Sequence, residues 1–112
     1  MKAVEVMKEY LKRAQIEGQD LSDMYADHGE LKNFKGEIFK GEIFKGRKEI
    51  QNFYTSPMPK GFKLTIQNID GDDTECIATV STTWDGLPNP VILEERLILE
   101  NEKIKSLEMI PK

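Results

Sequence analysis

Glu95 has the most distinctive chemical setting in the sequence. It alternates with Leu93, Leu97 and Leu99, so on a β-strand these four side chains would share one face. If that face lines the protein core, burial disfavours the carboxylate and raises the pKa of Glu95. A carboxylic acid that stays neutral can donate a hydrogen bond to a ligand carbonyl. A strand that exposes Glu95, or pairs it with a lysine, would make it a structural residue instead.

The other reactive side chains indicate structural roles. Cys76 alternates with Ala78 and Val80 on one face of a predicted strand, which favours a small core residue over a nucleophile. His28 is the single histidine, and we interpret it as a partly exposed structural residue. No histidines and cysteines have the spacing of a metal site, and the sequence contains no glycine-rich phosphate loop. We therefore expect no metal and no cofactor.

Large apolar residues spread along the chain could surround an interior cavity. Because some of them carry polar tips, they suit a small hydrophobic ligand, although they suit a filled core equally well. The candidate pocket residues are Tyr10, Tyr25, Phe34, Phe53, Tyr54, Trp84, Leu97 and Met109.

Length and composition narrow the functional classes. A chain of 112 residues is expected to form one domain, spanning residues 1–112. Its formal net charge of -4 disfavours nucleic acid as a partner, because phosphate binding needs a basic field. The lone Cys76 cannot form an internal disulfide and fits a reducing compartment. No apolar run has the length of a signal peptide or a membrane span. We expect a cytoplasmic protein that does not enter membranes.

Hydrophobic periodicity predicts three helices in the first half of the chain. Residues 3–14 repeat at helical spacing, with one apolar face. Asp20 can cap a second, short helix that buries Tyr25 and ends at residues 27–29. A third short helix is expected to start near Arg47.

After residue 61 the apolar period changes to two, which predicts strands. Helices that precede strands in this way indicate an α+β protein with helices packed on one face of an antiparallel sheet. The predicted strands include residues 62–67, 74–84, 91–99 and 104–110.

A five-residue repeat occupies residues 36–45, where Gly-Glu-Ile-Phe-Lys occurs twice in succession. An odd period would place Ile38 and Ile43 on opposite faces of one strand, so a bulge or turn is expected, most naturally at Gly41. The repeat could lengthen a hairpin at a pocket rim or a dimer edge. Alternatively, it is a recent or engineered tandem duplication that the fold absorbs in a loop.

Two segments of the chain resemble motifs of a known superfamily. The stretch Leu-Ser-Asp-Met-Tyr-Ala-Asp-His-Gly at 21–29 and the stretch Gly-Arg-Lys-Glu-Ile-Gln-Asn-Phe-Tyr at 46–54 are similar to motifs of the SnoaL-like branch of the NTF2-like superfamily. Ketosteroid isomerases belong to the same superfamily. The resemblance implies an NTF2-like, or cystatin-like, cone. In that cone, a long N-terminal helix and two short helices pack on a curved antiparallel sheet.

The resemblance also implies roles for three residues. Ketosteroid isomerases use a carboxylate base together with an oxyanion hole made of a tyrosine and a protonated acid. Carried over to this chain, the tyrosine falls near Tyr10, the base on Asn33 and the acid on Glu95. Asn33 cannot accept a proton at neutral pH, so ordinary ketosteroid isomerase activity is not expected.

Three functional hypotheses follow from these observations. The first is a protein that binds a small hydrophobic molecule. The second is an isomerase, dehydratase or cyclase that acts on a small hydrophobic carbonyl compound. The third is a non-catalytic, dimeric interaction domain with a filled core. Relatives usually pair through the outer face of the sheet, which here carries Ile77, Thr79, Ser81 and Thr83, so we expect a homodimer.

Overall fold

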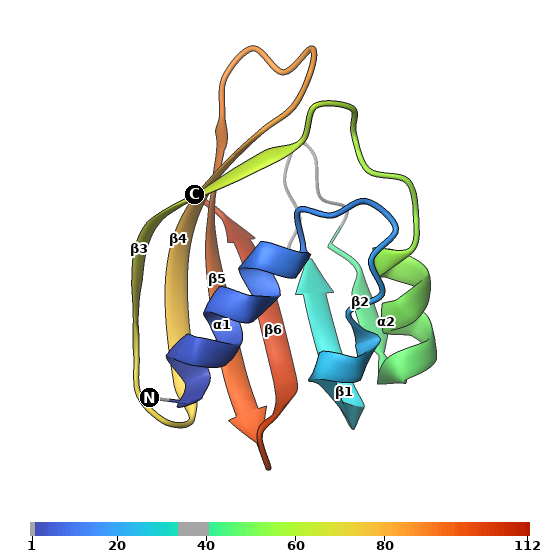
Figure 1. Ribbon diagram of the computed structural model, residues 1–112, viewed down its shortest axis with the longest axis vertical. Coiled ribbons are helices and arrows are strands. Elements are labelled where there is room, and N and C mark those ends of the chain that lie inside the picture. The colour runs from blue at the N-terminus through green and yellow to red at the C-terminus, as the bar shows by residue number, and fades with distance from the viewer. Residues whose placement is uncertain (1, 34–40) are drawn as a thin grey trace.

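A curved six-stranded sheet with helices on its concave face forms the molecule (Figure 1). The computed structural model describes residues 2–33 and 41–112. The elements are α1 (Lys2–Arg13), the 3₁₀ turn η1 (Ser22–Met24), β1 (Tyr25–Asn33), β2 (Ile43–Lys45), α2 (Gly46–Tyr54), β3 (Lys63–Gly71), β4 (Glu75–Thr83), β5 (Val91–Glu100) and β6 (Lys103–Pro111). Helix α1 packs on β3, β4 and β5, whereas α2 packs on β1 and β2. The expected α+β class is confirmed.

The strand order is β2-β1-β6-β5-β4-β3. The prediction of a wholly antiparallel sheet is wrong. Strands β1 and β6 run parallel, with Leu31 opposite Leu107 and Asn33 opposite Met109. The other neighbouring strands are antiparallel. Most of the chain lies between β1 and β6, so no tight hairpin forces them to run in opposite directions.

Helix α1 confirms the predicted amphipathic segment, because Ala3, Met7, Tyr10 and Leu11 are all buried. It has 12 residues. The amphipathic spacing places these four side chains in one stripe that covers the sheet.

The predicted second helix is wrong. Only the single 3₁₀ turn Ser22–Met24 forms, and Tyr25 begins strand β1. Residues 27–29 also belong to β1, where a bulge lies between Tyr25 and Glu30. A Cβ on Gly29 would lie 2.8 Å from the Ile104 carbonyl oxygen, so the backbones of β1 and β6 approach closely there. Long-range strand pairing has overridden the local helix signals at this point.

Strand β2 lies in the second copy of the repeat. Gly41 has φ 72°, which fits the expected turn, and Ile43–Lys45 forms β2. Strand β2 pairs with β1, with Phe44 opposite Leu31. The Phe44 ring also packs on Phe53 of α2, with ring centroids 4.9 Å apart. Residues 36–40 of the first copy lie outside the described part of the chain.

Helix α2 confirms the predicted third helix. It begins at Gly46, next to the expected Arg47, and buries Ile50. Among the described residues, no helix combines the length and apolar content that a membrane crossing requires.

Candidate functional site

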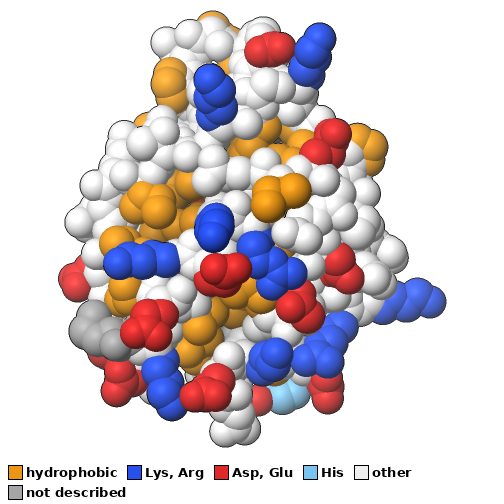
Figure 2. Space-filling view, viewed as in Figure 1, with side chains coloured by type: hydrophobic (Ala, Val, Ile, Leu, Met, Phe, Trp, Pro, Cys, Tyr) orange, Lys and Arg blue, Asp and Glu red, His pale blue; other side chains and the backbone are white. Residues whose placement is uncertain are grey.

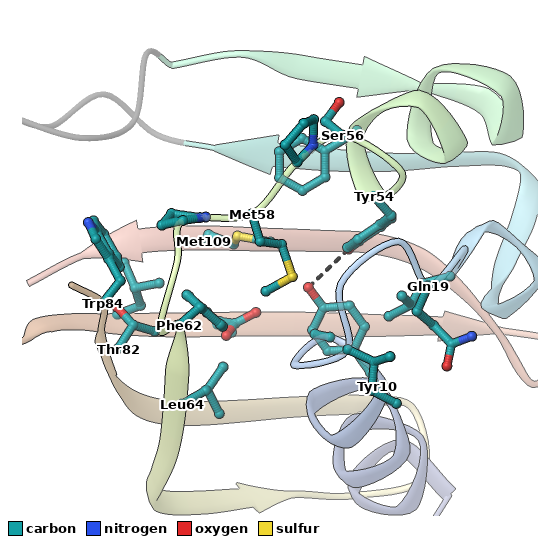
Figure 3. A pocket seen from close by; sticks show the side chains of 18 residues that line it. Tyr10, Gln19, Tyr54, Ser56, Met58, Phe62, Leu64, Thr82, Trp84 and Met109 are labelled. Atoms are coloured by element: carbon teal, nitrogen blue, oxygen red, sulfur yellow. Dashed lines mark hydrogen bonds between the residues drawn. The ribbon is translucent and has the colours of Figure 1, made fainter.

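A pocket with a volume of about 310 Å³ lies between α1, the end of α2, the segment after α2 and the concave face of the sheet (Figure 3). Five aromatic rings and two methionines contribute to its walls, together with Glu95. These rings and methionines belong to Tyr10, Phe53, Tyr54, Met58, Phe62, Trp84 and Met109. The remaining lining residues are Ala14, Ile16, Gln19, Leu21, Ser56, Pro57, Pro59, Leu64, Thr82 and Leu93.

Glu95 points from β5 into this pocket and is only 2% exposed. Strand alternation places it on the concave face, where its neighbours across the sheet are Ala78 and Met109. Its Oε1 atom is buried and has no hydrogen-bond partner among the described residues. Desolvation raises the pKa of Glu95 to about 7, and the Tyr10 hydroxyl offsets part of that rise. Near neutral pH this carboxyl group can therefore either donate or accept a proton.

A chain of tyrosine hydroxyls leads to Glu95. The hydroxyls of Tyr25 and Tyr54 lie 2.7 Å apart. The Tyr54 hydroxyl donates to that of Tyr10 over 2.9 Å (Figure 3). Burial raises the pKa of all three tyrosines well above the ordinary value, so each stays protonated at neutral pH. Because Tyr10 accepts from Tyr54, its own proton is free to point toward Glu95.

Arg47 connects the two sequence motifs, residues 21–29 and 46–54, next to the Tyr25 end of the hydroxyl chain. Its Nε donates to the Tyr25 carbonyl oxygen over 3.0 Å, and its Nη1 lies 3.0 Å from the Asp27 carboxylate. Helix α2 is thereby fixed to the first residues of β1. This arrangement positions Tyr54 of α2 beside Tyr25 of β1.

Asn33 lies in the same cross-strand row as Glu95, with Met109 of β6 between them. It is 6% exposed, and its Oδ1 atom is buried without a partner in the described part of the chain. Asn33 is not among the residues that line the pocket. The position that the resemblance assigns to a base is therefore buried, with strand β6 between it and Glu95.

The structure brings most of the predicted site residues together. Glu95, Tyr10, Phe53, Tyr54, Trp84 and Met109 line the pocket. Tyr25 and Leu97 are not among the lining residues, because both side chains are fully buried in the adjacent core. Tyr25 reaches the site through Tyr54, by a hydroxyl hydrogen bond and by a ring contact with centroids 6.1 Å apart. Phe34 lies outside the described residues.

Sequence reasoning missed the wall formed by residues 56–62. Met58 and Phe62 line the pocket, and the Phe62 ring stacks on Trp84 with centroids 6.3 Å apart. The Met58 N–H donates to Glu17 Oε2 over 3.1 Å, which holds the segment near α1. The only sequence signal was the alternation of Phe62 with Leu64, which placed both side chains on one strand face.

Among the described residues, no positively charged side chain lines the pocket. Thr82 donates its hydroxyl to the Val91 carbonyl oxygen, so that proton is already used. On the side of the molecule where α1 meets solvent, acidic and basic side chains are interspersed (Figure 2). Within residues 2–33 and 41–112, no group of histidine, cysteine and acidic side chains could hold a metal ion.

The sequence matches no protein-family model and no curated protein. Solved structures do share the fold. A proposed ketosteroid isomerase from Kribbella flavida superposes with a TM-score of 0.81 at 12% identity, over 99% of this chain and 78% of that one. An NTF2-like protein of unknown function from Mesorhizobium loti gives 0.77 at 16% identity, over 99% and 91% of the two chains.

A third neighbour is a protein from Catenulispora acidiphila with a ketosteroid isomerase-like fold, solved in complex with trimethylamine. It gives a TM-score of 0.74 at 19% identity, over 94% of this chain and 83% of that one. This chain therefore has the NTF2-like, ketosteroid isomerase-like fold predicted from its motifs.

Proposed function

We propose that the protein binds a small, mostly apolar molecule in this pocket, with the polar group of that molecule against Glu95. The observation that carries the proposal is Glu95 Oε1, which has no partner among the described residues and lies on the wall of an apolar pocket. A buried polar atom without a partner costs free energy, and a ligand that pairs with it would remove this cost. The trimethylamine complex of the Catenulispora acidiphila protein is compatible with small-molecule binding by this fold.

A filled, purely structural core is less well supported. A pocket of about 310 Å³ is within the size range of small-molecule sites and is large for a packing defect. A dimer remains compatible with ligand binding, since the expected pairing surface is on the opposite face of the sheet.

An isomerase, dehydratase or cyclase that acts on a carbonyl compound is the second candidate. The observation that favours it is the pair formed by Tyr10 and a Glu95 whose pKa is raised to about 7, because both groups could donate to a carbonyl oxygen. A separate proton-abstracting base is missing from the described pocket wall, where Glu95 is the only carboxylate. We therefore place binding ahead of catalysis.

Trp84 provides a direct test, because it is the single tryptophan and lines the pocket. Titration with small apolar probes such as tert-butylbenzene should change its fluorescence in a saturable way. Leu64→Phe narrows the pocket and should weaken this binding, whereas Thr65→Phe adds a ring on the exposed, opposite side of β3 and should not. An absence of saturable binding to the wild-type protein, or equal binding by both variants, would contradict the proposal.

A further inference from the structure

We propose that the polar group of this ligand is a substituted organic ammonium, and that an ionised Glu95 is its counter-ion. The inference rests on the proposed function, because it names the chemistry of the molecule that the pocket takes. Three features of the pocket support it: its aromatic walls, the free carboxyl oxygen and the scarcity of other polar partners.

The aromatic walls favour a cation. Five of the lining residues are aromatic, and the faces of aromatic rings carry negative electrostatic potential. Ammonium groups are attracted to such faces, most strongly to tryptophan, whereas a carbonyl oxygen is not. Of the residues that the structure describes, no lysine, arginine or histidine lines the pocket to repel a bound cation.

The free oxygen of Glu95 needs a positively charged or proton-donating partner once it is ionised. The groups that face it are Tyr10 from α1, Ala78 from β4 and Met109 from β6, with the Tyr54 hydroxyl one step further along the chain of tyrosines. None of these carries a charge at neutral pH. Within the described part of the chain, Tyr10 alone supports the carboxylate and the buried Oε1 has no partner, so no protein group serves as its counter-ion.

The lining also indicates how the ammonium is substituted. An ammonium with several N–H groups would need several acceptors, but the polar side chains in the walls are few. A tertiary or quaternary ammonium presents mainly methyl or methylene groups, which the aromatic rings and methionines can contact.

A matched pair of probes tests this assignment. Phenyltrimethylammonium and tert-butylbenzene have nearly the same shape and differ in charge. At pH 8 the cation should bind the wild-type protein at least about tenfold more tightly than the neutral probe. The preference should shrink at pH 5.5, where Glu95 is mostly neutral given its pKa of about 7.

The direction of proton exchange gives an independent readout. With a pKa of about 7, binding of the cation at pH 7 should release up to about half a proton, measurable by calorimetry in buffers of different ionisation enthalpy. Acetophenone serves as the carbonyl probe. If it binds more tightly than the cation and with proton uptake, Glu95 acts as a neutral donor and the ammonium assignment is overturned.

Two variants complete the test. Glu95→Gln should lose the preference for the cation while still binding tert-butylbenzene. Glu94→Gln removes the same charge from the other face of β5 and should behave as wild type. Equal binding of both probes by the wild-type protein, or an unchanged preference in Glu95→Gln, would overturn the ammonium assignment and leave small-molecule binding intact. Failure of all three probes to bind would contradict the proposed function itself.

Discussion

At residue 95 the chain carries an acid on a strand face that is otherwise filled by leucines. The core accepts it because Tyr10 supports the carboxyl group, and because the group is protonated to a large extent near neutral pH. A residue of this kind costs stability, and such residues cluster at binding and catalytic sites. The free energy associated with Glu95 can be measured directly.

Stability should depend on pH through Glu95. Its pKa is about 7 in the folded protein against an ordinary value of 4.5, so the folded state binds the proton more tightly. This contribution is fully present below about pH 4.5 and is lost as the pH rises through about 7. Between pH 4 and pH 8, the free energy of unfolding of the wild-type protein should fall by about 3 kcal/mol relative to Glu95→Gln.

Urea denaturation of both proteins across this pH range measures the difference. Glu94→Gln provides the control, because it removes an acid from the other face of β5 and should keep the wild-type pH profile. Parallel pH profiles for the wild type and Glu95→Gln would show that Glu95 titrates like a surface carboxylate.

Asn33 should not support isomerisation of a ketosteroid. Its amide cannot act as a base, and general-base catalysis is typically worth about 10²–10⁴-fold in rate. Asn33→Asp alone should also remain close to background, because residue 33 does not line the pocket and Met109 lies between it and Glu95. The measurement is the rate of double-bond migration for wild type and variant. Robust activity in the wild type would reveal another base, and Glu95 would be the first candidate, because it is the only carboxylate among the described lining residues.

At the scale of elements, the site depends on how α1, α2 and β1 meet. Each contributes one tyrosine to the hydroxyl chain, and Arg47 fixes α2 to β1 beside it. The rings reinforce this arrangement, since those of Tyr10 and Tyr54 pack edge to face with centroids 6.1 Å apart. The hydroxyl of Tyr54 is the middle member and serves both of its neighbours.

Tyr54→Phe should therefore destabilise the protein more than Tyr25→Phe, because Tyr25→Phe removes only the terminal hydroxyl of the three. Loss of the middle hydroxyl leaves the buried Tyr25 hydroxyl without its partner and removes one of the partners of Tyr10, which keeps Glu95. The cost is roughly 1–3 kcal/mol in the free energy of unfolding. Chemical denaturation of the two variants at pH 6 compares them. Equal stabilities would mean that the hydroxyl chain contributes little and that ring packing alone holds the elements together.

Deletion of Gly41–Lys45 should leave the protein folded. Because the two copies of the repeat are identical, the deleted chain retains one Gly-Glu-Ile-Phe-Lys directly before Gly46. That copy can form β2 in the same register, so the change falls on the connection from β1. Shortening that connection should alter stability by only about 0.6 kcal/mol.

The melting temperature of the deletion variant should therefore be similar to wild type or higher. Phe44→Ala is a useful comparison, because it removes the ring that packs on Phe53 and should lower the melting temperature. An unfolded deletion variant would show that both copies are needed for strand pairing.

At the scale of the whole molecule, the two faces of the sheet differ. Both helices pack over the concave face, as Figure 1 shows. The outer face of β4 presents Ile77, which is 43% exposed, together with Thr79 and Ser81. On the same face, Arg96 and Glu94 of β5 lie opposite Ile77 and Thr79 and form an ion pair with each other. Exposed apolar side chains such as Ile77 favour association.

We expect a homodimer through this outer face, and sedimentation at tens of micromolar should show it. Ile77→Lys should shift the protein toward monomer without unfolding it, because the side chain at this position is exposed. Ile66→Lys is the control. Ile66 is similarly exposed, but it pairs with the inward-facing Val80, so its side chain does not belong to the outer face. A monomeric wild-type protein would contradict the expectation.

The sequence alone determined the elements whose patterns are local. The amphipathic spacing in residues 3–14 and the alternation in the last three strands each identify a face, because helix and strand periods differ. The alternation with leucines was enough to predict that Glu95 points inward. Turn and helix signals likewise located α2, and the motifs at either end of residues 21–54 indicated the fold.

Only the tertiary structure decided the features that depend on distant parts of the chain. Residues 27–29 carry helix-ending signals, yet the pairing of β1 with β6 makes them a strand. The same pairing puts strand β6 between Asn33 and Glu95, whereas counting along the sequence placed Asn33 in the site. The wall at Met58 and Phe62 exists because Glu17 and Trp84 hold that segment over the sheet. Local patterns cannot specify such contacts, because their free energy comes from residues far apart in sequence that meet only after folding.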